Sequence, residues 1–196
     1  MNGPEMTGSL CRIRPLRDAD AQARWDLVND GDSRKLLGAV EETDFDEVRE
    51  WCETAADRPD RFDWAVTALD SQEYLGEVQL INLDLEDRKA RLRLAMRQQY
   101  RGRGYSVDFV PLVLDFAFAP EPEGLGLHRV YAAMPSVNTR VHALVQAMGF
   151  TFEGRLRETH YDGDRWLDTL VSSVLADEWI ESRRNREVPA LSESPD

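Results

Sequence analysis

The sequence predicts one α+β domain, and three observations support this prediction. Helical and strand-like apolar periods alternate along the 196 residues. Three strand-like runs follow one another in the first half, separated by short polar turns, which indicates antiparallel pairing. With 42% hydrophobic residues, the chain is long enough to bury a single sizeable core.

The first half of the chain is expected to form a strand, two helices and then three strands. The strands show apolar alternation, and the helices show apolar residues at helical spacing. Asp18 opens the first helix, and Thr43 with the acidic residues after it is typical of the start of the second. The expected strands are 11–16, 62–69, 74–85 and 90–96, and the expected helices are 19–29 and 44–56.

The second half changes period after the segment RGRGYS. Residues 107–119 predict a buried helix that Pro111 kinks, because proline removes one backbone donor. A short strand at 127–135, a helix at 138–149 and a final strand within 165–179 follow. The chain after Trp179 lacks apolar periodicity and is expected to be frayed.

The composition favours a soluble cytoplasmic protein that does not bind nucleic acid or membranes. The formal net charge is -13, which disfavours phosphate-backbone binding and would attract cationic amines, although surface solvation is the simpler explanation and the one we prefer. No apolar stretch is long enough to cross a bilayer, and the polar start lacks a signal-peptide layout. The two cysteines have no partners at metal-ligand or redox spacing, so no metal site is expected.

The glycine segment RGRGYS (101–106) joins an expected strand to an expected helix. Backbone N–H groups at the start of a helix attract anions, and glycines let a phosphate approach the main chain closely. Tyr105 follows Gly104 where a nucleotide-hydrolysing Walker loop needs lysine, and the third glycine of a Rossmann fingerprint is missing. The segment alone is compatible with a phosphate site or with a simple turn.

The run from Gln99 to Gly104 resembles the acyl-CoA loop, Q/R-x-x-G-x-G/A, of the GNAT superfamily of N-acyltransferases. ARLRLAMRQQYRGRGYSVDFVPLVLDFAF, HRVYAAMPSVNTRVHALVQAMGFTFEG and YDGDRWLDTLVSSVLADEW follow in family order. They are most similar to the branch that acetylates the N-termini of ribosomal proteins and many small amines. The resemblance implies a domain at 9–181, an N-terminal tail at 1–8 and a flexible tail at 182–196.

This resemblance implies a mixed, mostly antiparallel sheet that is splayed between the strands at 90–96 and 127–135, with helices on both faces. Acetyl-CoA, the acyl donor, would lie in that split with its diphosphate on the main-chain N–H groups of residues 101–105. Asn138 would hold the cofactor arm, or it simply caps the helix that follows. The residues expected to bind the cofactor are Leu94, Ala95, Met96, Gln99, Arg101, Gly102, Arg103, Gly104, Tyr105, Ser106 and Asn138.

The implied reaction is attack of a primary amine on the thioester, with the main chain near Leu94 stabilising the oxyanion. Many relatives carry a glutamate base and a serine or tyrosine acid, but the corresponding positions here are Arg91, Val141 and Val145. Proximity without an acid or base is one explanation, and an acyl-CoA-binding module without activity is another. The side chains that could transfer protons instead are Glu77, His160 and Tyr161.

Arg91 and Arg93 alternate with leucines, so both belong to one face of their strand. If this face lines the substrate cleft, the two guanidinium groups favour an acceptor that carries an acid group beside its amine. The alternative is an exposed face whose arginines pair with Glu77, Glu86 or Asp87. Trp25 is a candidate for the acceptor mouth.

The expected partner is a small-molecule amine or a peptide N-terminus. A nucleotide-binding regulator is the competing class, and it predicts stabilisation by ATP rather than by acetyl-CoA. The oligomeric state is left open between a monomer and a homodimer.

Overall fold

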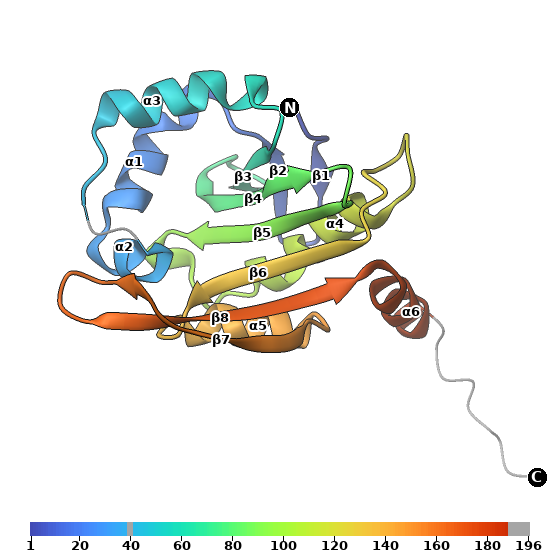
Figure 1. Cartoon of the computed structure of the whole chain (residues 1–196). Helices are drawn as coiled ribbons and strands as arrows, with labels where there is room; N and C mark the ends of the chain where they lie inside the picture. Colours follow the sequence, from blue (N-terminus) through green and yellow to red (C-terminus); the bar gives the residue numbers. More distant parts are fainter. Residues whose placement is uncertain (39–40, 188–196) are drawn as a thin grey trace, which may run out of the picture.

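The computed structural model describes residues 1–38 and 41–187, and its centre is one eight-stranded sheet (Figure 1). The strand order is β1-β2-β3-β4-β5-β6-β8-β7, and every neighbouring pair is antiparallel except β5 with β6. The predicted α+β class with a mixed, mostly antiparallel sheet is therefore confirmed.

The helices and strands follow the predicted order, with four additions. The strands are β1 (Met6–Thr7), β2 (Cys11–Pro15), β3 (Phe62–Ala68), β4 (Tyr74–Asp84), β5 (Lys89–Met96), β6 (Arg129–Pro135), β7 (Thr151–Tyr161) and β8 (Trp166–Leu175). The helices are α1 (Ala21–Asn29), α2 (Gly31–Leu37), α3 (Phe45–Thr54), α4 (Tyr105–Phe118), α5 (Thr139–Ala147) and α6 (Ala176–Glu187).

Helices cover both faces of the sheet and bury two apolar clusters. On one face, Leu27 of α1 and Val48 of α3 pack against small residues of β3 and β5. On the other face, α4 contributes Phe109 and Leu114 to the larger cluster, which Val145 of α5 also joins. Burial of these side chains is the main force that holds the helices to the sheet.

The sheet is split between β5 and β6, as the family resemblance implied. Only three residue pairs join the two strands, from Lys89 with Arg129 to Arg91 with Tyr131. Beyond Arg91, β5 stays paired with β4 on its other side, up to Met96. The second half of β5 therefore has one edge without a partner strand, and the two strands diverge there (Figure 1).

The four additions are β1, α2, β7 and α6, and none of them has a clear apolar period. Asp30 caps the seven-residue α2 by accepting a hydrogen bond from the N–H of Ser33, and Gly38 ends it in a left-handed conformation. β7 is an edge strand exposed along almost its whole length, so it lacks the alternation that identifies a half-buried strand.

Both chain ends contain regular structure where tails were predicted. β1 pairs with β2, so Met6 and Thr7 extend the sheet. Helix α6 continues through residues 182–187, because Trp179 is buried and donates to Asp115 of α4, and Arg183 pairs with the same carboxylate. The rest of the predicted tail, residues 188–196, lies outside the described residues.

No helix among residues 1–38 and 41–187 is long and apolar enough to span a membrane.

Asp108, in the first turn of α4, anchors this helix to the N-terminal strands. Its carboxylate accepts hydrogen bonds from the backbone N–H groups of Ser9, Leu10 and Cys11 at 2.8, 2.9 and 3.2 Å. Burial alone would raise the pKa of Asp108, but the N–H donors outweigh it and lower the pKa below its usual value.

We predict that Asp108→Asn lowers the free energy of unfolding at pH 7 by about 1–3 kcal/mol, because an amide cannot accept all three bonds. Because the folded-state pKa is the lower one, the Asp108 contribution exists above about pH 4 and disappears as the pH falls through the folded-state pKa. Denaturant unfolding at several pH values measures this loss. Glu86→Gln, which removes the same charge from an exposed turn, should change stability little at any pH.

Candidate functional site

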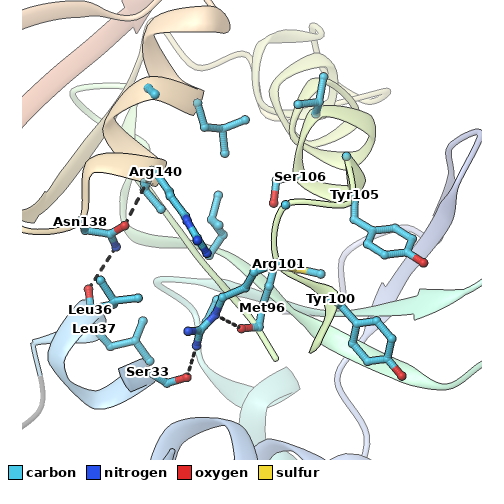
Figure 2. Close-up of a pocket in the computed structure, with 18 residues that line it drawn as sticks. Ser33, Leu36, Leu37, Met96, Tyr100, Arg101, Tyr105, Ser106, Asn138 and Arg140 are labelled. Atoms are coloured by element: carbon cyan, nitrogen blue, oxygen red, sulfur yellow. Dashed lines mark hydrogen bonds between the residues drawn. The ribbon is translucent and has the colours of Figure 1, made fainter. Parts of the chain in front are cut away.

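A pocket of about 510 Å³ lies at the open end of the split (Figure 2). Its walls come from segments far apart in the sequence: α2, the second half of β5, the glycine loop with the start of α4, and the start of α5. Leu94, Ala95 and Met96 line it from β5. The pocket therefore forms where β6 leaves β5.

The main chain of the glycine loop forms part of the pocket wall. Gly102 and Gly104 have φ angles of 75° and 86°, a left-handed region that glycine adopts at little cost. Within the part of the chain that the structure describes, the N–H groups from Gly102 to Ser106 donate to no other residue. Open space surrounds the position that a side chain at Gly102 would occupy. The loop therefore presents several free N–H donors at the start of α4.

Arg101 turns its side chain away from this loop and toward α2 (Figure 2). Its Nε donates to the carbonyl oxygen of Met96 at 2.9 Å, and its Nη2 contacts the hydroxyl of Ser33 and lies 3.6 Å from Asp30. Arg101 thus joins the end of β5 to α2. Its guanidinium is already occupied before any ligand arrives.

Arg103 and Gln99, which the motif also suggested as cofactor-binding residues, do not line the pocket. Arg103 is exposed, with its guanidinium 5.7 Å from the ring centre of Tyr100. Gln99 is also exposed and does not line the pocket.

Asn138 caps the helix that follows it, and its side chain also binds α2. Its Oδ1 caps α5 by accepting from the N–H of Val141 at 3.3 Å, and its Nδ2 donates to the carbonyl oxygen of Leu36 in α2 at 3.2 Å. Asn138 also lines the pocket. Since Arg101 binds the other end of α2, this helix is held from both sides of the split.

The sequence analysis missed several residues that line the pocket, among them three of α2 and one arginine of α5. Ser33, Leu36 and Leu37 belong to α2, which has no clear sequence signature. Arg140, in the first turn of α5, points its side chain into the pocket (Figure 2). It lies two residues after Asn138 on a helix that was predicted, so a search for charged residues near that asparagine could have found it.

Glu77 is buried on β4 and is fully engaged. Arg24 of α1 donates to it at 2.8 Å, Tyr74 at 3.2 Å and Gln79 at 3.4 Å. In the strand register Glu77 lies opposite Ala95, a residue of the pocket wall. Its position is therefore near the site, but both of its oxygens already have partners.

His160 of β7 packs against Gly38, the residue that ends α2. A Cβ placed on Gly38 would lie 3.0 Å from the imidazole Cε1 atom. The buried Nε2 atom of His160 has no hydrogen-bond partner among the described residues. Tyr161, in contrast, donates its hydroxyl to Gly163 in the exposed β7–β8 turn. Neither His160 nor Tyr161 is among the residues that line the pocket.

Trp25 lies in the layer of α1 and α3 and is not among the residues that line the pocket. Its indole N–H donates to the carbonyl oxygen of Thr43 at 3.0 Å, and its ring packs edge-on against Phe45.

Arg91 and Arg93 form none of the ion pairs that the exposed-face alternative required. Arg91 reaches across the split and donates to the carbonyl oxygen of Ala133 in β6 at 2.6 Å. Asp87 instead pairs with Lys89. Both arginines are partly buried, and burial lowers the pKa of each guanidinium.

Cys11 and Cys52 are both buried, and the structure gives neither the surroundings of a reactive thiol. Burial is the main cause that raises the pKa of each to about 12. Both thiols are therefore protonated and unreactive at neutral pH. Across the described part of the chain, no group of three histidine, cysteine, aspartate or glutamate side chains could hold a metal ion.

Comparisons with known proteins agree with this geometry. Residues 11–151 match the model of the acetyltransferase (GNAT) domain. The uncharacterized N-acetyltransferase YoaA of Bacillus subtilis is 22% identical, over 83% of this chain and 92% of its own. The "putative ribosomal N-acetyltransferase YdaF" of the same organism is 29% identical, over 53% of this chain and 55% of its own.

The fold also matches solved structures. A crystal structure of spermidine N-acetyltransferase from Vibrio cholerae in complex with CoA and spermine has a TM-score of 0.77, at 22% identity, over 86% of this chain and 96% of that one. The family model covers well over half of the sequence. The chain therefore belongs to the GNAT family and is an N-acetyltransferase that uses acetyl-CoA as its acyl donor.

Proposed function

We propose that the protein transfers the acetyl group of acetyl-CoA directly to the primary amine of a small molecule. The observation that supports this most is the pocket at the split, where the free N–H groups of the glycine loop meet the unpaired edge of β5. The N–H groups of the loop suit an anion, and the unpaired edge of β5 suits an extended amide chain. Coenzyme A carries both features in one molecule.

In this proposal the diphosphate binds to the N–H groups of Gly102 to Ser106, at the positive end of α4. Arg140, which points into the same pocket, adds a positive charge. The pantetheine arm then follows Leu94 to Met96 and fills main-chain hydrogen bonds that β6 leaves open. Asn138 would exchange its bond to α2 for one to the arm.

The thioester end would lie beside Leu94, which lines both the main pocket and the narrow space between β5 and β6. The neutral amine attacks the thioester carbonyl, and a main-chain N–H near Leu94 stabilises the oxyanion that forms. The carbon–sulfur bond then breaks and CoA leaves as its thiolate. Holding amine and thioester together supplies much of the acceleration.

A covalent acetyl-enzyme is not part of this proposal, because both cysteines are buried and protonated. For the proton that the amine loses, His160 is the strongest of the three candidates. Glu77 is engaged by Arg24, and Tyr161 faces the exposed turn.

A peptide N-terminus is the second acceptor class, and similarity to YdaF and to the ribosomal-protein branch favours it. An acyl-CoA-binding module without activity is the second function, and Arg91, Val141 and Val145 at the usual base and acid positions favour it. A peptide acetyltransferase and a binding module would use the same cofactor site. The acceptor assay therefore separates these two alternatives from the main proposal.

Amine-dependent release of free CoA thiol is the expected result when acetyl-CoA is incubated with a panel of amines and short peptides. Initial rates at varied concentrations of both substrates should give intersecting double-reciprocal lines, as direct transfer requires. His160→Gln should lower kcat and leave acetyl-CoA affinity unchanged, whereas Tyr161→Phe should change neither. Tight acetyl-CoA binding with no thiol release from any acceptor would instead support the binding module.

Gly102→Ala should weaken CoA binding about tenfold or more, because the new methyl group points into the space proposed for the diphosphate. Gly149→Ala is the matched control, since Gly149 also has a positive φ (91°), has open space around it and does not line the pocket. Each variant should lose about 1–2 kcal/mol of stability through left-handed strain. Calorimetric titration with CoA measures the difference, and equal affinities for the two variants would refute the diphosphate site.

A further inference from the structure

Arg91 and Arg93 line a second, narrow pocket of about 40 Å³ inside the split. Residues 91–94 of β5 form one wall, residues 132–135 of β6 form the other, and Leu36 and Leu37 of α2 also line it. This narrow pocket shares Leu94 with the main pocket, so it continues from the place proposed for the thioester.

The acidic side chains near this face of the sheet are already paired with other arginines. Glu77 binds Arg24 at 2.8 Å, and Asp63 binds Arg61 at 2.7 Å. These pairs leave no carboxylate for Arg93. Among the residues that the structure describes, the guanidinium of Arg93 forms no ion pair and no hydrogen bond, although Gln79 lies opposite Arg93 in the register.

Arg93 therefore keeps a positive charge in a place where charge is costly. Burial lowers its pKa, and of the charges around it Glu77 alone favours the charged form, while Arg91, Arg24 and Arg61 oppose it. A partly buried charge without a partner loses some of its hydration, and a fork-shaped guanidinium without a partner suits a carboxylate. The chain as a whole is strongly acidic, with a formal net charge of -13, whereas this site is positively charged.

We propose that Arg93, assisted by Arg91, binds a carboxylate group of the acceptor, so that the enzyme acetylates amines that also carry a carboxylate. This inference rests on the proposed function, because it assigns a substrate class to the same site. The narrow pocket has room for one small anionic group and not for a long cationic chain. With the carboxylate fixed there, an amine on the neighbouring carbon lies near the thioester end beside Leu94.

The same geometry argues against a polyamine in this position, although the similar Vibrio cholerae structure contains spermine. A polyamine would bring more positive charge next to two guanidinium groups that form no ion pair with any described residue. Amino acids and their decarboxylated amines therefore discriminate between the two substrate classes.

The experiment compares matched acceptors in the thiol-release assay. The pairs are alanine with ethylamine, phenylalanine with phenethylamine and arginine with agmatine, and spermidine is added as a polyamine. A charge-assisted bond to the carboxylate predicts that at least one amino acid has a kcat/KM about tenfold to a hundredfold above that of its amine.

Three variants test whether Arg93 causes this preference. Arg93→Gln should raise KM for the preferred amino acid about tenfold or more, leave kcat nearly unchanged and not affect its decarboxylated partner. Arg93→Lys should restore part of the loss, because it keeps the charge without the fork. Arg88→Gln, which removes a guanidinium from the exposed turn before β5, should behave like the wild type. The Tm of Arg93→Gln should not fall, since no bond of Arg93 is lost.

Other results would overturn the inference. Equal rates for both members of every pair, or a preference for spermidine, would refute the carboxylate site while leaving N-acetyl transfer intact. An equal loss of kcat for the amino acid and its decarboxylated amine in Arg93→Gln would mean that Arg93 acts on the thioester. A large fall in the Tm of this variant would mean that Arg93 has a structural role.

If no acceptor releases thiol although CoA binds, the proposed function fails, and calorimetry with the CoA-bound protein then tests the site directly. Binding of the amino acids but not of the amines, lost in Arg93→Gln, would support the inference. Absence of that binding would refute it.

Discussion

The divergence of β5 from β6 after three paired residues is the feature on which the rest of the structure depends. β5 is paired with β4 along its second half, and β6 is paired with β8 along its whole length, so each half-sheet is complete without the other. The split therefore costs only the hydrogen bonds between the facing edges of β5 and β6. A ligand with an extended amide chain can replace those bonds, which explains how a stable fold keeps an open main-chain edge at its centre.

Helix α2 connects the two sides of this split. Arg101 binds it from the glycine loop, and Asn138 binds it from the start of α5. Both residues belong to motif positions that suggest a cofactor role, yet in this structure their side chains hold the helix that forms one wall of the pocket (Figure 2). In the proposed complex, a ligand that replaced either bond would release part of α2 and change the pocket wall.

The sequence predicted those features that local patterns encode. The glycine loop, the buried α4 and the order of the central strands each follow from a short run of residues. Helix α2 was missed because seven residues with two leucines give no apolar period, and β7 was missed because both of its faces are exposed. The engagement of Glu77 could not be predicted either, since Arg24 is 53 residues away in the sequence. The pairing of carboxylates with particular arginines depends on the packing of α1 over the sheet.

That same pairing leaves Arg93 without a counter-ion in the described part of the chain, so the packing of α1 and the proposed acceptor chemistry have one physical origin. The central claim, however, concerns the split itself. A crystal structure with acetyl-CoA tests it most directly. We expect the diphosphate within hydrogen-bond distance of the N–H groups of residues 102–106, and the thioester between β5 and β6 beside Leu94. A diphosphate bound elsewhere, or β5 and β6 paired continuously up to Met96 in the complex, would contradict the account.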